Sequence, residues 1–427
     1  MHQGDRDATG ELGRAPAVEW ARLFSDAAQR RGLSGDGLAL ARAAREEIKQ
    51  RARRTSALID QVPGLPLTTE ECSILEPPFG RSTHLPSPDR PYAHLAVHTG
   101  LGGVSVTPLW ATAAGGNVVM STVENRIKAR ATALDPMVAL SVPAGIGSPL
   151  CYEVGGFVKQ SPDPERTVIR ALAALYSKPG ISEHTDGNYT SWDRREGNER
   201  LRLEVLAYRV RNDLGDVPAF RTAPYIRRLA PRYGGTRPPR WSAANRHEDF
   251  RTLDARDTDG SAPYGAGDEL AVLGVVRHSG HPGYRPLNAT YGHLACFDRS
   301  GLLRCRQLGF DVIDVRGETR ISFLVDRRDC EALRRSPAAA LSVTKFRGGS
   351  TWLQSRGLVE LHDGADDLRR AIRRLEDRYS RDHRRLALDL GAAERAPGDC
   401  VLATLSRQKV SSRYREAGRS LRSAGAR

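Results

Sequence analysis

The feature that most constrains this chain is an internal repeat. The segment YAHLAV at Tyr92 returns as YGHLAC at Tyr291, 199 residues later, and ALSV at Ala139 returns unchanged at Ala340, 201 residues later. Three further matches keep the same order and nearly the same spacing: Asp135-Pro136 with Ser336-Pro337, Gly156 with Gly357, and Ile169 with Ile372. Collinear matches at one spacing predict one fold built twice, in domains of about 120–150 residues each.

Each copy has the pattern of a mainly β domain. Short apolar or alternating runs between Gly, Pro and Asp turns predict six strands in the first copy, at 92–97, 104–110, 118–121, 138–142, 152–158 and 201–210. Helical spacing predicts a short helix that ends at Leu134, before Asp135-Pro136, and a second helix at 165–177. Many short antiparallel strands with one or two helices favour a small closed barrel.

The two copies are expected within a larger domain plan. A mostly helical, basic N-terminal extension is predicted first, and a long Gly-, Pro- and Arg-rich connector separates the two barrels. A basic tail follows the second barrel. The predicted boundaries are 1–62 for the extension, 63–212 for the first barrel, 213–287 for the connector, 288–412 for the second barrel and 413–427 for the tail.

Composition excludes several classes of protein. The chain has 427 residues, of which 39% are hydrophobic and 27% charged, values usual for globular proteins of more than one domain. It has no run of about 18 apolar residues that would cross a membrane as a helix. Six cysteines without a CxxC pair favour neither a disulfide framework nor a cysteine zinc site. They indicate a reducing, cytoplasmic location.

The net charge of +14 is concentrated at the C-terminal end. Residues 407–427 hold seven cations and one anion, and thus +6 of the total. A solvated basic tail is favoured over nucleic-acid binding, because the sequence has no RNA-binding aromatic signature, helix-turn-helix pattern or zinc finger. No nucleic-acid or membrane partner is expected.

Two hydroxyls and two cations gather where a predicted strand meets the short helix. Ser121 and Thr122 end the strand, and Arg126 and Lys128 open the helix. The N-terminus of a helix offers free N–H groups and the positive end of a dipole, and so attracts anions. Two interpretations stay open from the residues alone. The stretch is either a capped surface helix with ordinary charges, or a site for a phosphate group.

The motifs around this stretch resemble a known family. They run from VSVTPLW through VVMSTVENRIKARATALDP to YEVGGFV, and their matching residues are Pro108, Trp110, Ser121, Thr122, Arg126, Lys128, Arg130, Asp135, Pro136, Tyr152, Gly156 and Val158. This pattern is similar to the flavin-binding split β-barrel family, which includes pyridoxamine 5′-phosphate oxidases and flavin- or deazaflavin-dependent reductases. The resemblance covers residues 90–212 and, more weakly, 289–412.

The resemblance implies a cofactor and a site. Family members are usually homodimers that hold FMN, a deazaflavin coenzyme or, in some branches, haem between two barrels. Carried over to this chain, Thr122, Arg126 and Lys128 hold the cofactor phosphate, and Ser121 and Trp110 belong to the same cofactor site. The Arg-x-Lys spacing resembles the deazaflavin reductases, whereas an oxidase would carry an arginine near Val106. Ala131 stands where the family often has asparagine, which affects the tightness of binding.

The expected fold is therefore mainly β (α+β), with two tandem six-stranded split β-barrels packed as an intramolecular pseudo-dimer and a helical extension. The chain would then be a monomer or a homodimer of such units. At an offset of 201 residues, Phe323 takes the place of Thr122 and Asp329 that of Lys128, while Ser322 and Arg327 match their counterparts. The ring and the carboxylate would both disfavour a phosphate. One cofactor per chain, bound at the first half, is the prediction.

The expected function is a flavin- or deazaflavin-dependent oxidoreductase that acts on a small-molecule substrate, such as a metabolite in a tailoring step. A haem-binding barrel protein and a non-catalytic basic binding module are the alternatives. No acid–base pair stands out, so no catalytic residue is assigned. Tyr152, Tyr176 and Trp110 either line the pocket or pack in the core, the latter being favoured.

The histidines give little support for a metal site. His94 and His293 occupy the same place in the two copies and are expected to pack inside the sheets. His278 and His281, in HSGH, have a ligand-like spacing but lie in a Gly-rich loop, so no metal site is predicted.

Overall fold

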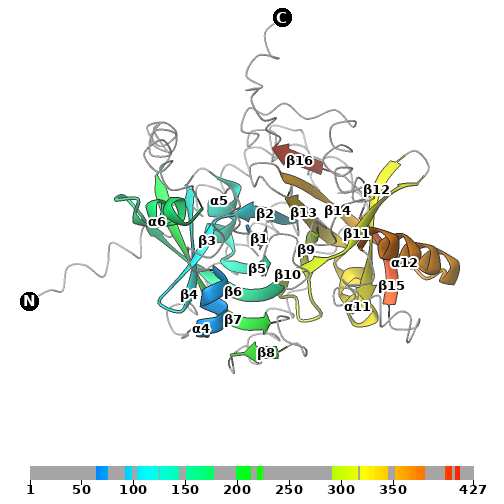
Figure 1. The fold of residues 1–427 in the computed structure, drawn as a ribbon, viewed down its shortest axis with the longest axis horizontal. Helices are drawn as coiled ribbons and strands as arrows, with labels where there is room; N and C mark the ends of the chain where they lie inside the picture. Colours follow the sequence, from blue (N-terminus) through cyan, green and yellow to red (C-terminus); the bar gives the residue numbers. More distant parts are fainter. Residues whose placement is uncertain are drawn as a thin grey trace, which may run out of the picture.

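The protein forms two antiparallel β-sheets that lie side by side, the first drawn in cyan and green and the second in yellow and orange (Figure 1). The structure is a computed structural model. It describes residues 64–75, 92–98, 103–124, 126–143, 151–176, 199–212, 219–223, 225, 291–315, 318–344, 352–379, 400–405 and 409–413. The predicted N-terminal extension, most of the connector, and the tail beyond residue 413 lie outside these residues.

The first half contains three helices and eight strands among its described residues. The helices are α4 (Thr69–Leu75), α5 (Ile127–Leu134) and α6 (Thr167–Tyr176). The strands are β1 (Ala93–His98), β2 (Val104–Leu109), β3 (Ala111–Ala114), β4 (Asn117–Val123), β5 (Met137–Pro143), β6 (Cys151–Pro162), β7 (Arg200–Asn212) and β8 (Ala219–Thr222).

The described part of the second half repeats this plan with two helices and eight strands. The helices are α11 (Arg327–Arg335) and α12 (Ala365–Tyr379). The strands are β9 (Gly292–Phe297), β10 (Leu303–Leu308), β11 (Phe310–Val315), β12 (Glu318–Asp326), β13 (Ala338–Thr344), β14 (Trp352–His362), β15 (Cys400–Leu405) and β16 (Lys409–Arg413).

The two sheets share one strand order. The first runs β2-β1-β5-β6-β7-β4-β3, and the second runs β10-β9-β13-β14-β15-β12-β11. Each is a continuous path of short antiparallel strands, and the two paths match as the repeat predicts. Each sheet has eight strands rather than the expected six. One additional strand of the first half is β3, which begins directly after the stretch 104–110. The other additional strand there is β8, which pairs with β7, and in the second half β16 pairs with β14. Strand β8 lies in the segment predicted to be connector.

Local sequence explains the main turns and helix ends. The β3–β4 hairpin turns at Gly115 and Gly116, whose φ angles of 59° and 77° lie in the left-handed region that glycine adopts without strain. Helix α4 begins with a capping box: the Glu71 N–H donates to Thr68 Oγ1 (3.2 Å), and the Thr68 N–H donates to Glu71 Oε2 (2.8 Å). Helix α5 ends at Leu134, before the Asp-Pro pair, as predicted.

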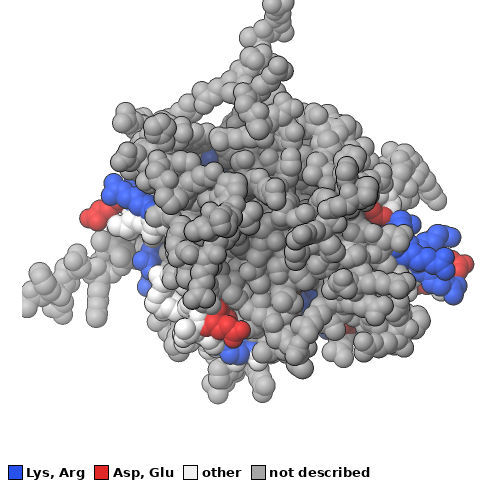
Figure 2. All heavy atoms as spheres, in the orientation of Figure 1, with Lys and Arg blue, Asp and Glu red and all other residues white. Residues whose placement is uncertain are grey.

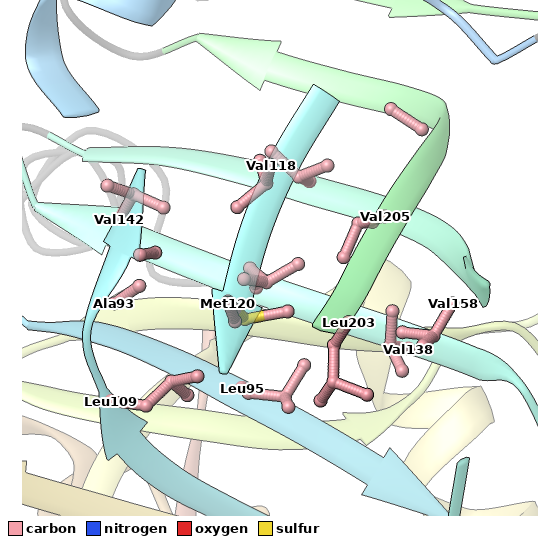
Figure 3. Packing of buried hydrophobic residues seen from close by; sticks show 14 of the residues in the cluster. Ala93, Leu95, Leu109, Val118, Met120, Val138, Val142, Val158, Leu203 and Val205 are labelled. Atoms are coloured by element: carbon pink, nitrogen blue, oxygen red, sulfur yellow. The ribbon is translucent and has the colours of Figure 1, made fainter. Parts of the chain in front are cut away.

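Each sheet encloses its own apolar core. In the first half, side chains from β1, β4, β5 and β7 point toward one another inside the sheet, as Leu95, Met120, Val138 and Leu203 show (Figure 3). The second half packs the matching strands around Phe310. Burial of such side chains is worth about 1.5–3 kcal/mol each, which makes these cores the main source of stability in each half.

A third apolar cluster joins the two halves. It combines buried residues in or next to strands of both halves, from β1, β2, β5, β6, β7 and β8 on one side and from β9, β10 and β13 on the other: Ala96, Val104, Val106, Met137, Ala139, Phe157, Tyr208, Ala223, Ala295, Phe297, Leu302, Leu303, Cys305 and Ala340. We call this set the interface cluster. It holds the two barrels together as an intramolecular pseudo-dimer, which confirms the expected fold class.

Candidate functional site

The connection from β4 to α5 carries four of the five predicted site residues, Ser121, Thr122, Arg126 and Lys128. Strand β4 ends at Val123, and the Arg126 N–H donates back to the Val123 carbonyl (3.1 Å). Arg126 is the N-cap residue of α5, with an extended backbone (φ −80°, ψ 147°) and no side-chain cap hydrogen bond. Lys128 lies in the first helical turn and is partly buried. The positive end of the helix dipole therefore coincides with two cations.

Thr122 supplies a buried hydroxyl next to this turn. Its residue is 3% exposed, and its Oγ1 has no hydrogen-bond partner among the described residues. The Ser121 Oγ is likewise buried and without such a partner. An unmade hydrogen bond of a buried hydroxyl costs about 1–3 kcal/mol. Buried polar groups that lack a protein partner are often met by a ligand or by water.

Ser121 and Thr122 lie on opposite faces of β4, because side chains alternate along a strand. Met120 and Val118, two and four residues before Thr122, belong to the inner core, to which Ala131 of α5 also belongs. Val119, two residues before Ser121, packs against α6. Thr122 therefore shares its face with α5, and Ser121 shares its face with α6.

Trp110 lies on the α6 side as well. Its ring stacks on that of Tyr176 with 5.3 Å between centroids and 13° between planes. The Tyr176 hydroxyl is held by β3, and the buried Tyr152 donates its O–H to the Glu71 carbonyl (3.3 Å). These aromatic residues pack in the core, as favoured from the sequence. Thr122, Arg126 and Lys128 lie along the connection from β4 to α5, whereas Trp110 and Ser121 lie on the α6 side.

Two residues that sequence reasoning missed hold α5 in position. The Gln160 amide of β6 donates to the Ala129 carbonyl (2.7 Å) and to Thr132 Oγ1 (2.6 Å). Thr132 in turn donates to the Lys128 carbonyl (2.7 Å). Nothing in the local pattern marks Gln160, because its contacts reach back 28 and 31 residues to α5.

The Asp-Pro pair at the end of α5 is fixed by a histidine. His98 Nδ1 lies 3.0 Å from Asp135 Oδ2, and the Met137 N–H donates to Asp135 Oδ1 (3.2 Å). Both His98 and Asp135 are buried. The Asp-Pro motif therefore acts as a bracket between β1 and β5, and it anchors the end of α5 opposite to the candidate site.

Matching hydrogen bonds define how the two halves correspond. The Tyr176 hydroxyl donates to the Ala111 carbonyl (3.1 Å) and accepts from the Ala111 N–H (3.3 Å). The Tyr379 hydroxyl donates to the Phe310 carbonyl (3.2 Å) and accepts from the Phe310 N–H (3.0 Å). Ala111 and Phe310, at the start of β3 and β11, are therefore equivalent positions.

This correspondence corrects the expected partner of Thr122. Ala111 pairs with Met120 across β3–β4, and Phe310 pairs with Phe323 across β11–β12. Phe323 thus matches Met120, and it is a fully buried core residue rather than the edge of a groove. Two residues further on, Val325 matches Thr122. The second half therefore lacks the hydroxyl, as predicted, but through a different residue.

The offset of 201 residues fails at Thr122 because the connection between strand and helix differs in length in the two halves. Three residues, 124–126, separate β4 from α5, whereas β12 ends at Asp326 and α11 begins at Arg327. The offset changes within this turn and returns to 201 at the helix ends. There, the Asp135 N–H bonds the Ala131 carbonyl, and the Ser336 N–H bonds the Ala332 carbonyl, both at 2.8 Å. Asp329 thus remains the counterpart of Lys128.

The Asp329 carboxylate is paired with two arginine side chains. It lies 3.0 Å from Arg304 Nη1 through Oδ1 and 3.2 Å from Arg306 Nη1 through Oδ2. Both arginines come from β10. The connection from β12 to α11 therefore contains an internal ion-pair cluster, whereas the connection from β4 to α5 carries cations at the same place.

The described histidines are held inside the protein. His94 and His293 stack on each other, and His293 Nδ1 lies 2.9 Å from Ser141 Oγ. Within the described ranges, no cluster of three or more His, Cys, Asp or Glu side chains has the geometry to hold a metal ion. His278 and His281 lie outside these ranges. Cys296 and Cys305 lie on the neighbouring strands β9 and β10, and all six cysteines are free thiols.

On the face drawn in Figure 2, the described charged side chains gather at the edges of the molecule, with blue and red close together over α6 and α12. In α12, Arg369 pairs with Asp366 (2.6 Å) and Arg370 with Asp367 (2.5 Å). Such exposed pairs within one helix contribute little energy. None of the helices among the described residues is both long and apolar enough to cross a membrane.

Comparisons with known proteins give matches to solved structures only. An F420 reductase is 23% identical over 35% of this chain and 98% of its own, with a TM-score of 0.23. A conserved hypothetical protein from Mycobacterium tuberculosis is 14% identical over 38% of this chain and 96% of its own, with a TM-score of 0.27.

A third solved structure is that of a pyridoxamine 5′-phosphate oxidase-related, FMN-binding protein from Nostoc punctiforme. It is 19% identical over 36% of this chain and 85% of its own, with a TM-score of 0.25. No protein-family model matches the chain, and no curated protein matches it. By the strand order of its own two sheets, the chain is a tandem of two split β-barrels, the fold of the flavin- and deazaflavin-binding family that its sequence resembles.

Proposed function

We propose that the first half binds the phosphate of FMN or of a deazaflavin coenzyme, and that the chain is an oxidoreductase acting on a small molecule. The observation that carries this proposal is the buried Thr122 hydroxyl, which has no hydrogen-bond partner among the described residues and shares its face with α5. A phosphate oxygen at the first turn of α5 would accept a hydrogen bond from this hydroxyl.

The charges around Thr122 fit a phosphorylated cofactor. Arg126 offers a planar fork of N–H donors, and Lys128 offers a compact positive charge. The first turn of α5 adds backbone N–H groups and its dipole. Hydrogen bonds of charged groups to phosphate are stronger than neutral ones, at about 1.5–3 kcal/mol each. The second half carries Val325 and Asp329 at the positions of Thr122 and Lys128, and so lacks both features.

The surroundings of Val106 favour a deazaflavin-dependent reductase over a pyridoxamine 5′-phosphate oxidase. Val106, near the position where an oxidase would carry an arginine, is fully buried in the interface cluster. A charged side chain there would be costly without a partner. We therefore keep the reductase branch as the first candidate for the activity, with FMN as the second candidate for the cofactor.

The chemistry is divided between cofactor and protein. When bound, such a coenzyme transfers a hydride to or from its substrate. This chain's own residues hold the phosphate through Thr122, Arg126 and Lys128. Gln160 and Thr132 fix α5, and so the position of Lys128, on the barrel. The described histidines do not favour haem, because His98, His293 and His362 have hydrogen-bond partners inside the fold and the buried His94 ring is stacked on that of His293.

The test is a cofactor titration of the purified, cofactor-free full-length protein. FMN and the deazaflavin coenzyme are each added, and binding is followed by fluorescence. We expect Lys128→Ala to weaken binding of one of them about tenfold or more. Lys159→Ala, which removes an exposed lysine of β6, is the matched control and should bind as the wild type does. Equal affinity of the Lys128→Ala variant and the wild type would refute the site.

A further inference from the structure

The second half has charged residues where the first half has neutral ones. His94 pairs with Pro108 across β1–β2, and His293 pairs with Gln307 across β9–β10. Counting back along the strands, Arg304 corresponds to Ser105 and Arg306 to Thr107. Strand β10 therefore brings two guanidinium groups to a position where β2 has two hydroxyls.

These guanidinium groups converge on Asp329, in the first turn of α11. Arg304 Nη1 donates to both carboxylate oxygens (3.0 and 3.2 Å), and Arg306 Nη1 donates to Oδ2 (3.2 Å). The side chains of Arg304 and Arg306 are 16% and 14% exposed. Two arginine forks at the N-terminal turn of a helix form the arrangement that binds a phosphate, and here a carboxylate of the chain takes that place.

The first half closes the cluster from the other side. Glu153 of β6 lies 3.5 Å from Arg304 Nη2, 3.9 Å from Arg306 Nε and 3.9 Å from Arg211 Nη1. Burial alone raises the pKa of the Glu153 carboxyl, but Arg304, Arg211 and Arg306 outweigh it and hold the pKa below its usual value. Three guanidinium groups thus lie next to two carboxyl groups.

The corresponding place in the first half has neutral residues where the cluster has Glu153 and Arg304. Ser141 pairs with Glu153 across β5–β6, and Ser342 pairs with Gln354 across β13–β14, so Gln354 corresponds to Glu153. The Gln354 amide donates to Ser105 Oγ (2.9 Å) and joins the two halves there. The ion pair between Glu153 and Arg304 is therefore replaced by an uncharged hydrogen bond, and Lys128 stands where Asp329 would be.

We propose that the cluster of Arg304, Arg306, Asp329 and Glu153 is a phosphate site that the protein fills with its own carboxylates. Asp329 takes the position of a phosphate group on the two arginines, so this cluster accepts no phosphorylated ligand while Asp329 is present. Removing that carboxylate opens the site to an inorganic phosphate ion. This inference rests on the fold and on the contacts of the cluster, and it holds whether or not the first half binds a cofactor.

The experiment compares thermal unfolding of two full-length variants, Lys128→Ala and Lys128→Ala/Asp329→Ala, in chloride and in inorganic phosphate at equal ionic strength. The shared Lys128→Ala change removes the proposed cofactor contact from both. We expect phosphate to raise the Tm of the double variant and not that of the single one. At about ten times its dissociation constant, bound phosphate shifts the folding equilibrium about elevenfold.

Glu331→Ala in the same background is the matched control. Glu331 lies on the same helix, about half exposed, 3.6 Å from Arg299. Equal phosphate responses of the Asp329 and Glu331 variants would overturn the proposal. Asp329→Asn, which removes the charge but keeps the shape, replaces the alanine variant if that variant is unfolded in chloride. If either of the two Asp329 variants is unfolded in chloride and folds in phosphate, the proposal is supported. If phosphate stabilises neither the alanine nor the asparagine variant, the proposal is overturned.

Discussion

The imidazole rings of His94 and His293 stack face to face, with 3.5 Å between their centroids and 11° between their planes. The two residues occupy the same position of equivalent strands, β1 and β9. A residue that contacts its own counterpart lies next to the pseudo-twofold axis between two related halves. This stack therefore marks the centre of the intramolecular pseudo-dimer, and both rings are buried there.

The histidine pair predicts that the protein loses stability in mild acid. Burial lowers the pKa of His293 to about 3, and burial together with the neighbouring His293 lowers the pKa of His94 well below its usual value. The unfolded chain binds these protons near pH 6.5, whereas the folded chain does not. Stability is thus complete above about pH 6.5 and falls by about 1.4 kcal/mol per pH unit for each histidine below it.

Urea unfolding between pH 8 and pH 4 measures this effect. The double variant His94→Phe/His293→Phe keeps two stacked rings but has no imidazole to protonate. Its stability should depend less on pH than that of the wild type over the same range. Identical slopes for the two proteins would show that the histidines are not the cause.

Thr122→Val tests the candidate site without disturbing the fold. Valine has nearly the same shape and is the residue at the equivalent position, 325, in the second half. Because the Thr122 hydroxyl has no partner among the described residues, its loss should not lower the free energy of unfolding and should raise it by up to about 1–3 kcal/mol. Affinity for the cofactor should fall about tenfold, as measured by the same titration as for Lys128.

Ser121→Ala is the natural control for that prediction. It also removes a buried hydroxyl without a described partner, but on the α6 face of β4. We expect it to leave the affinity for the cofactor unchanged. A loss of affinity in the serine variant and none in the threonine variant would place the site on the α6 face instead.

Tyr176→Phe and Tyr379→Phe should destabilise the protein to a similar extent. Each hydroxyl makes two hydrogen bonds to the backbone of the strand β3 or β11. Its removal leaves a buried N–H and a buried carbonyl without that partner, at a cost of about 1–3 kcal/mol. Chemical denaturation measures both variants, and a neutral effect in either would contradict the equivalence of the two anchors.

Gly156→Ala should destabilise the first barrel through direct crowding. A Cβ at this position would lie 2.5 Å from Val205 Cγ1 and 2.8 Å from the Leu206 carbonyl oxygen. The strand register between β6 and β7 also shifts at this point, between Gly155 and Gly156. Overpacking of a well-filled core costs about 1–3 kcal/mol. A melting temperature equal to that of the wild type would show that β7 can move aside.

The interface cluster predicts how separated halves behave. Its apolar residues come from both barrels and pack against one another, so we expect each half expressed alone to expose part of this cluster. We expect the separate halves to aggregate or to bind each other when mixed, and the full chain to be monomeric by light scattering. Two halves that each remain monomeric and do not associate would contradict this.

Strand positions and helix ends were predictable because they depend on local signals. The Asp-Pro pair after Leu134, the Gly-Gly turn before β4 and the alternation of apolar residues each act within a few neighbours. The repeat added the prediction of two related barrels, since matching segments must fold alike.

Residue equivalence in the second half was not predictable from the repeat. A constant offset aligned Thr122 with Phe323, because the shorter turn before α11 leaves no signature in the matching segments. The strand register resolves it in favour of Val325. Contacts such as that between Arg304 and Glu153 join residues 151 positions apart, and no local pattern marks them. The placement of Ser121 and Thr122 on opposite faces does follow from the alternation of side chains along a strand. The family motif lists the two residues together and does not indicate this.

The covalent link between the two barrels removes a restriction that acts on every symmetric dimer of identical chains. In such a dimer, one codon specifies the same residue on both sides of the axis, so a change that abolishes one groove abolishes the other as well. Here, Lys128 and Asp329 are encoded separately. One barrel can retain a lysine at the helix start while its twin replaces it with a carboxylate and becomes a structural scaffold. Substitutions in the second barrel can therefore accumulate without changing the corresponding residues of the first barrel.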